Sequence, residues 1–131
     1  MKVFFDVDLT LLFADGSRWA LRPGAEEVFR LLKGQGCDIY VWTATGRSHA
    51  ERVVHTFGLA PWVTDCLDKD SDCPIRPDMV VDDDEFLVQK YSGVWVKPYR
   101  QVDPDDRELY RVVEAVERIK RNGFRPSTPS A

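Results

Sequence analysis

Several features are scarce or missing in this sequence, and each absence narrows the class of protein it can encode. Cysteine is scarce: Cys37, Cys66 and Cys73 are an odd number without a CxxC pair, which disfavours a disulfide framework or a zinc site. Free thiols in a reducing environment fit better, so we expect a cytoplasmic protein. No apolar run approaches the roughly 20 residues that span a bilayer. No secretory-signal pattern is visible at the start, so we expect no membrane partner.

An excess of positive charge is also missing. The chain holds 18 Lys and Arg against 22 Asp and Glu, a net charge of −4, which disfavours a general nucleic-acid-binding surface. Hydrophobic residues make up 44% of the 131 residues, enough for one core in one domain. We expect that domain over residues 1–122 and a flexible tail over 123–131, where prolines and serines follow the last helical pattern.

Apolar segments that resemble strands alternate with segments of helical spacing. The alternation predicts an α/β fold with a parallel sheet. The expected strands cover 2–6, 37–42, 79–82 and 94–96. The expected helices run from Pro23 to Gly34 or Gly36, over 47–57, from 85 to 90 as a short turn, and over 104–121 with Asp103 as its cap.

Two stretches of the chain have no clear period. Residues 9–21 are predicted to be a connection with a turn at Asp15-Gly16-Ser17, because Asp, Gly and Ser favour turns. Residues 59–78 are predicted to be mostly loop, with a short strand at Trp62-Val63-Thr64.

The first strand runs directly into the sequence Asp6-Val7-Asp8-Leu9-Thr10. Strand alternation predicts that Asp6 and Asp8 face the same side. Neighbouring carboxylates repel each other unless a cation or a shared proton lies between them. The pair therefore indicates a metal site or acid–base chemistry. The alternative is a strand end rich in turn residues, with Asp8 capping a loop.

Two further apolar segments also end in polar clusters. Ile39–Trp42 is followed by Thr43-Ala44-Thr45-Gly46, and Met79–Val81 is followed by Asp82-Asp83-Asp84-Glu85. In an open parallel sheet the carboxyl ends of the strands lie along one edge, where ligands bind. We therefore expect the three clusters to meet in one site.

The ordered set of motifs resembles the haloacid dehalogenase-like (HAD) hydrolase superfamily over about residues 1–100. DVDLT matches the first motif, DxDx[TV]; Thr43 after IYVW matches the second; Asp82-Asp83 after MVV matches the fourth. The third motif is a Lys or Arg ahead of the fourth. Lys69 and Arg76 both fit, and Lys69 is favoured because a proline follows Arg76.

This resemblance implies a Rossmann-like three-layer α/β/α sandwich and a Mg²⁺-dependent phosphatase that works through an aspartyl-phosphate. By the family pattern Asp6 is the nucleophile, and Asp8 is the general acid and then the general base. The Asp6 carboxylate, the Asp8 backbone carbonyl and the Asp82 carboxylate would hold Mg²⁺, with Asp83 orienting a ligand or a water. Three residues would bind the phosphate: Thr43, Ala44 and Lys69.

Residues 9–22 and 44–68 leave no room for the cap domain that larger members of this superfamily carry. The resemblance therefore implies a capless member with an open site. An open site indicates either a bulky phosphorylated substrate or partial closure by a neighbouring subunit of a homo-oligomer.

Other interpretations stay open at this point. The chain could be a phosphate- or metal-binding module without turnover, a receiver-like phospho-accepting signalling domain or, with less support, a metal-dependent nuclease.

Several individual residues also have open roles. His49 and His55 are interpreted as surface or packing residues, because six residues apart they do not share a helix face well. Trp19 is a candidate substrate contact, because loops carry many binding residues. Thr45 is an alternative phosphate ligand to Thr43. Arg47 is either a substrate contact or a surface residue at a helix start.

Overall fold

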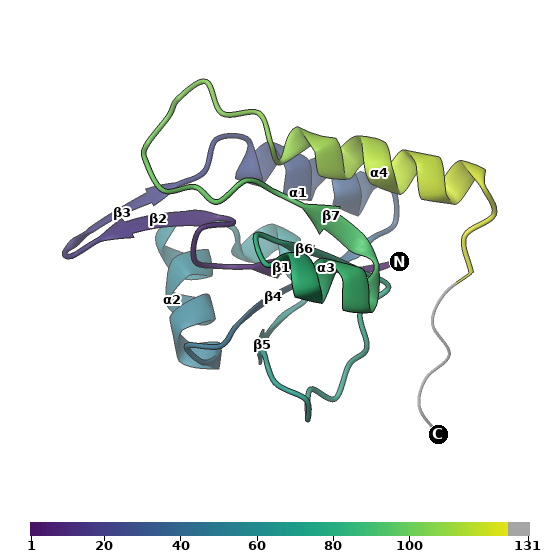
Figure 1. Cartoon of the computed structure of the whole chain (residues 1–131), viewed down its shortest axis with the longest axis horizontal. Coiled ribbons are helices and arrows are strands. Elements are labelled where there is room, and N and C mark those ends of the chain that lie inside the picture. Colours follow the sequence, from purple (N-terminus) through teal and green to yellow (C-terminus); the bar gives the residue numbers. More distant parts are fainter. Residues whose placement is uncertain (126–131) are drawn as a thin grey trace.

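The computed structural model describes residues 1–125, so residues 126–131 of the predicted tail lie outside the described part of the chain. Five parallel strands form one sheet in the order β5-β4-β1-β6-β7, and two antiparallel strands, β2 and β3, form a hairpin (Figure 1). The bounds of the strands are β1 Lys2–Asp6, β2 Leu12–Asp15, β3 Arg18–Leu21, β4 Asp38–Thr43, β5 Asp65–Asp68, β6 Met79–Asp82 and β7 Gly93–Trp95. Those of the helices are α1 Ala25–Gly34, α2 Arg47–Thr56, α3 Glu85–Tyr91 and α4 Tyr110–Arg121, with a 3₁₀ turn at Ala60–Trp62.

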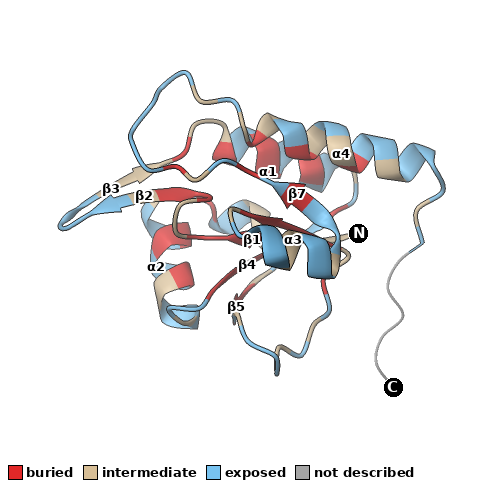
Figure 2. Ribbon diagram, viewed as in Figure 1, coloured by how far each residue is buried: buried red, intermediate tan, exposed pale blue. Residues whose placement is uncertain are grey.

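The central sheet is buried on both faces, which explains why its strands are almost continuously apolar. Val3 and Phe5 of β1 pack on the face that α1, α2 and α4 cover. Phe4 points to the opposite face, where it packs with Trp42 and Val80 beneath α3 and residues from the β5–β6 connection. Figure 2 shows buried residues concentrated on the strands and on the inner sides of the helices. The predicted fold class, a Rossmann-like three-layer α/β/α sandwich with a parallel sheet, is confirmed.

The order of the strands creates a switch point between β1 and β6. From β1 the chain winds outward through β4 to β5, and then crosses back to place β6 on the other side of β1. Crevices at the carboxyl ends of strands on either side of such a switch are where open α/β sheets bind ligands. Asp6 and Asp82 are the last residues of these two strands.

The structure corrects four local predictions. The turn at Asp15-Gly16-Ser17 is present, but it closes the β2–β3 hairpin instead of lying in an irregular connection. Pro61 lies in a 3₁₀ turn, so Trp62 is not in a strand, and the chain enters the sheet as β5 only at Asp65.

Two helices also begin later than predicted. α1 starts after Gly24, whose φ of 86° is outside the helical region, and not at Pro23. Asp103 caps a local turn by accepting from the N–H of Asp105 (3.0 Å), and α4 begins only at Tyr110.

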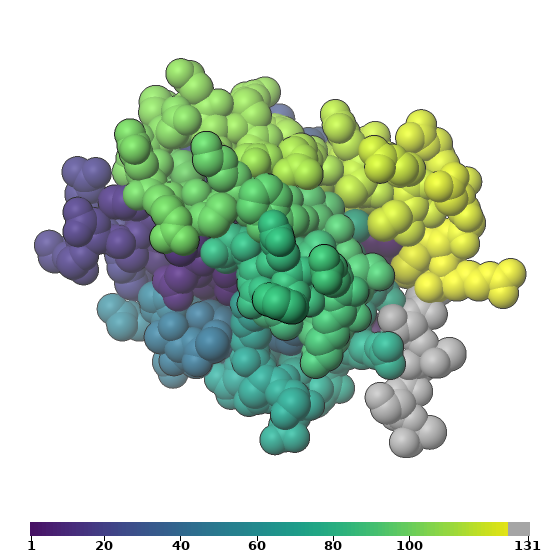
Figure 3. Space-filling model, in the orientation of Figure 1, coloured from purple at the N-terminus to yellow at the C-terminus, as the bar shows by residue number. Residues whose placement is uncertain are grey.

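A buried ion pair joins the hairpin to the connection before α4. The Arg22 side chain is 1% exposed, and its Nε and Nη2 donate to Oδ1 and Oδ2 of Asp106 over 2.8 Å and 2.9 Å. Its Nη1 donates to the carbonyl oxygens of Leu9 (3.4 Å) and Thr10 (3.3 Å). In Figure 3 the connection containing Asp106 (light green) lies beside the hairpin (dark purple). Arg22 therefore fixes the chain just after Asp8.

Removal of the Asp106 carboxylate should destabilise the protein strongly. Asp106→Ala would leave the Arg22 guanidinium buried without its partner, which costs about 3–5 kcal/mol of unfolding free energy. Asp105→Ala, which removes a neighbouring exposed carboxylate, should change it by less than about 0.5 kcal/mol. Urea denaturation of the two variants and the wild type measures both values. Equal stability of the two variants would contradict the role of the pair.

The contribution of this ion pair to the free energy of unfolding should also depend on pH. Burial alone would raise the pKa of Asp106, but the hydrogen bonds and charge of Arg22, with the N–H of Glu108, outweigh it and lower the pKa below 3.8. A carboxyl group whose pKa is lower in the folded than in the unfolded protein stabilises the fold fully at pH values above its unfolded-state pKa. This stabilisation is lost as the pH falls from the unfolded-state pKa through the folded-state pKa. The stability difference between wild type and Asp106→Ala should therefore shrink as the pH falls below about 4.

Within residues 1–125, no helix combines the length and the apolar character that crossing a membrane requires.

Candidate functional site

The ends of β1 and β6 place carboxylates side by side. The two strands pair in parallel with Phe5 opposite Val81, so the next residues, Asp6 and Asp82, are neighbours at the carboxyl edge. Both are buried, Asp82 completely. Asp83 joins them: carboxylate oxygens of the three residues lie within 4.8 Å of one another, close enough to hold one metal ion.

Lys69 supplies a cation to this cluster. Its Nζ lies 3.1 Å from Oδ1 of Asp6 and 2.7 Å from Oδ2 of Asp82. Its backbone N–H donates to the carbonyl oxygen of Thr43 (3.1 Å), which anchors the lysine to the end of β4. Of the two candidates for the third motif, Lys69 is therefore the one that contacts the carboxylates. Arg76 lines a cavity on the α3 face of the sheet together with Trp42.

Thr10 is a member of the site to which the sequence analysis gave no role. It is fully buried, and its Oγ1 lies 3.2 Å from Oδ2 of Asp6 and 3.3 Å from Oδ1 of Asp83. The hydroxyl can thus donate to either carboxylate and orient it. The threonine that closes the DVDLT motif was the signal for this role.

The crowding of buried carboxylates perturbs their ionisation. Burial, and then the charge of Asp82, raise the pKa of Asp6 to about 8 against the opposing effect of Lys69. Burial also raises the pKa of Asp82, although hydrogen bonds from Lys69 and from the N–H of Asp84 lower it in part. Burial lowers the pKa of Lys69, but its attraction to the two carboxylates outweighs that effect and raises it. When all three carboxylates are ionised, they carry more negative charge than the one lysine neutralises.

Two of the predicted phosphate-binding residues, Thr43 and Ala44, lie at the end of β4, the strand next to β1. Thr43 is buried, and its Oγ1 accepts from the N–H of Thr45 (3.2 Å), whereas Ala44 and Thr45 are exposed. The amino end of α2 already has a partner within the chain, because Oδ1 of Asp68 accepts from the N–H of Arg47 (2.7 Å). This carboxylate would compete with a phosphate for the start of that helix.

Arg47 is used in surface ion pairs. Its guanidinium pairs with Glu51 (2.7 Å) and Asp65 (3.0 Å). Of the two roles that the sequence left open, the structure therefore favours that of a surface residue.

The carboxylate of Asp8 is separate from the three-carboxylate cluster. The chain turns sharply after it, with Leu9 at a φ of 66°, and Oδ1 of Asp8 lies 3.2 Å from Nε2 of His49. The Asp8 side chain is 43% exposed. Among the described residues, Asp8 is not part of the carboxylate group formed by Asp6, Asp82 and Asp83. β1 ends at Asp6, two residues before Asp8.

His49 is the functional candidate that the sequence analysis set aside as a surface or packing residue. It lies on the first turn of α2, with its ring against Trp19 of β3 at a centroid distance of 5.5 Å. The spacing between His49 and His55 contained no signal for this contact, which joins residues 19, 49 and 8 through the tertiary fold. Trp19, the candidate substrate contact, packs on the histidine.

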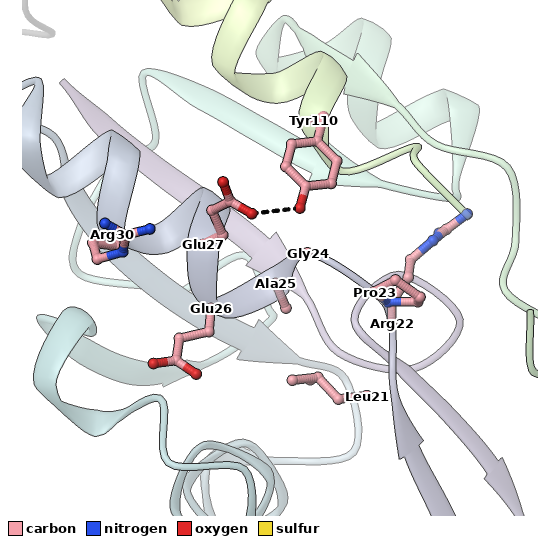
Figure 4. A pocket seen from close by; sticks show the side chains of 9 residues that line it. All are labelled: Leu21, Arg22, Pro23, Gly24, Ala25, Glu26, Glu27, Arg30 and Tyr110. Atoms are coloured by element: carbon pink, nitrogen blue, oxygen red, sulfur yellow. Dashed lines mark hydrogen bonds between the residues drawn. The ribbon is translucent and has the colours of Figure 1, made fainter. Parts of the chain in front are cut away.

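Two other cavities of the described chain differ in whether predicted site residues line them. One, of about 430 Å³, lies between the starts of α1 and α4, and Tyr110 donates across it to Glu27 (2.7 Å; Figure 4). Gly24 has a φ of 86°, which strains other residues, and a Cβ there would lie 2.6 Å from the Tyr110 ring and displace it. This cavity contains none of the predicted site residues. The other, of about 320 Å³, reaches Ala44 and Lys69 from the α3 side.

Comparison with known proteins defines the fold but no activity. No protein-family model matches the chain, and no curated protein matches it. Among solved structures, an uncharacterized protein from Listeria monocytogenes serotype 4b superposes with a TM-score of 0.64 and 19% sequence identity, over 92% of this chain and 98% of that one. Similarity at this level of identity supports the α/β sandwich alone.

Magnesium should bind and stabilise the folded protein in a pH-dependent manner. A ligand that binds only the folded state at 100 times its Kd adds about 2.7 kcal/mol of stability. Metal ligands must be deprotonated, and the pKa of Asp6 is about 8. The affinity for Mg²⁺ should therefore fall about tenfold per pH unit below 8. Thermal unfolding with and without Mg²⁺ measures the stabilisation, and calorimetric titration at pH 6 and pH 8.5 measures the affinity.

Two variants test whether Mg²⁺ binds at this cluster or at exposed acidic residues in general. Asp82→Asn should abolish the Mg²⁺-induced increase in Tm, whereas Asp105→Asn, at an exposed acid remote from the cluster in sequence, should retain it. Binding that is unchanged in Asp82→Asn, or equal at both pH values, would contradict the assignment of the site.

Proposed function

We propose that the protein is a capless member of the HAD-like hydrolase superfamily, a Mg²⁺-dependent phosphatase that hydrolyses phosphate monoesters through an aspartyl-phosphate on Asp6. One observation carries the proposal: residues from four motif positions, far apart in sequence, gather at the carboxyl edge of one parallel sheet. These residues are Asp6 at the end of β1, Thr43 at the end of β4, Lys69 after β5 and Asp82 at the end of β6.

The residues present fit a hard divalent cation. Three carboxylates share one small region, and burial together with mutual repulsion raises the pKa of Asp6, as expected of a site that lacks enough positive charge. Asp6, Asp82 and the backbone carbonyl of Asp8 would hold Mg²⁺, with Asp83 orienting a ligand or a water. When bound, the ion would offset the charge of the phosphate and of the carboxylates.

The chain's own groups account for the bond changes. An oxygen of Asp6 forms a bond to phosphorus as the bond to the leaving oxygen breaks, and Asp8 gives its proton to that oxygen. Asp8 then takes a proton from the water that hydrolyses the aspartyl-phosphate, and inorganic phosphate leaves. Throughout, the Lys69 ammonium stays beside Asp6 and offsets the charge there. The Thr43 hydroxyl and the Ala44 N–H would hold the remaining phosphate oxygens.

The order of the strands disfavours the receiver-like alternative. Numbered by their place in the chain, the five parallel strands lie in the order 3-2-1-4-5. Flavodoxin-like folds, which receiver domains share, have the order 2-1-3-4-5. The open carboxyl edge, by contrast, agrees with a capless phosphatase that acts on a bulky phosphorylated substrate.

Replacement of the nucleophile provides the first test. Asp6→Asn removes the attacking charge while keeping the shape of the side chain, so Mg²⁺-dependent phosphate release from p-nitrophenyl phosphate should fall by at least about 10³-fold. Asp15→Asn, at an exposed carboxylate in the hairpin, should retain wild-type activity. Equal turnover in Asp6→Asn and the wild type would eliminate Asp6 as the nucleophile.

The two candidates for the third motif give opposite predictions. Because Lys69 lowers the pKa of both Asp6 and Asp82, Lys69→Met should move the acid limb of the pH–rate profile upward by about one to three pH units and slow the reaction. Arg76→Met should leave the profile in place. A shifted profile in Arg76→Met with an unchanged one in Lys69→Met would reverse the assignment.

A further inference from the structure

The Asp8 carboxylate has little to hold it in one orientation. It is 43% exposed, and an exposed side chain with two free torsions populates several rotamers. Two contacts restrain it. Thr45 Oγ1 donates to Oδ2 over 3.4 Å, which is long for a hydroxyl hydrogen bond. Nε2 of His49 lies 3.2 Å from Oδ1 and is the closer contact.

His49 is itself held from two elements. Its side chain is 16% exposed and meets the Trp19 ring at 83°, an edge-to-face arrangement that aromatic rings favour. On α2, one turn beyond His49, the Arg52 guanidinium lies 5.4 Å from the centre of the same Trp19 ring. The hairpin and the helix thus fix the imidazole, and the imidazole contacts the carboxylate.

We infer that His49 is a positioning residue that aims the Asp8 carboxyl group at the leaving oxygen; this inference rests on the proposed phosphatase function. A general acid must lie within hydrogen-bond reach of the atom that it protonates. Misplacement by about 1 Å can cost about 10²-fold in rate. His49 does not touch the phosphate in this role, and the proton passes from Asp8 to the leaving oxygen.

The role has a chemical signature that mere structural support lacks. A leaving group of low pKa departs as a stable anion and needs no proton, whereas one of high pKa needs the proton as the bond to phosphorus breaks. Loss of a well-placed general acid should therefore reduce kcat/KM more as the pKa of the leaving group rises. A loss of folded protein would instead reduce the apparent kcat/KM for all substrates by the same factor.

His49→Phe is the main test, because a phenyl ring can keep the packing against Trp19 while it removes Nε2. In the presence of Mg²⁺, kcat/KM should fall about 10- to 100-fold for phenyl phosphate but less than about twofold for 2,4-dinitrophenyl phosphate. His49→Gln carries an amide nitrogen that can reach Asp8 and should restore most activity toward phenyl phosphate. His55→Ala, at an exposed position of the same helix, should behave as wild type.

Each alternative outcome is decisive. Equal losses for both substrates in His49→Phe, or no loss for either, overturn the role of His49 even when Asp6→Asn is inactive and the phosphatase proposal stands. If His49→Phe does not fold, His49→Gln is measured instead. A loss of kcat/KM for phenyl phosphate in His49→Gln as large as that in Asp8→Asn then overturns the inference. A wild-type protein that hydrolyses neither substrate overturns the proposed function, and this inference with it.

Discussion

Repulsion between Asp6 and Asp82 is the constraint on which the rest of the molecule depends. Both carboxylates end adjacent strands of a buried sheet, and their burial together with their mutual charge raises the pKa of Asp6 to about 8. If these two positions served stability alone, apolar residues would be expected there, since buried charges are costly. Lys69 offsets part of the repulsion. The remaining excess of negative charge is the physical basis for proposing a divalent cation.

The fold supports this arrangement by gathering distant segments at one edge. The strand order makes β1 and β6 neighbours, and the cross-over from β5 delivers Lys69 to both. On the other side, Arg22 holds the carbonyl oxygens just after Asp8 and pairs with Asp106. The loop that follows β1 is thus tied to the connection before α4, which restricts its movement at an otherwise open site.

Strong local signals made much of the fold and of the acidic site predictable. Apolar segments that end in Asp or Thr predicted β1, β4 and β6, and parallel-sheet geometry predicted that their ends meet. The hairpin was missed because its short strands, exposed in part, lack the continuous apolar pattern of the central sheet. The contact between His49 and Asp8 was missed because it depends on tertiary packing around Trp19. α4 begins only at Tyr110, after a connection in which Asp106 bonds Arg22, a long-range contact that no periodicity encodes.

A crystal structure grown with Mn²⁺ and beryllofluoride, a mimic of a phosphoryl group on aspartate, tests the central claim most directly. The account predicts anomalous density for one Mn²⁺ between the carboxylates of Asp6 and Asp82, with the beryllium bonded to an oxygen of Asp6 and its fluorides near Thr43 and Lys69. Manganese bound elsewhere, or a beryllofluoride group attached to another carboxylate, would contradict it.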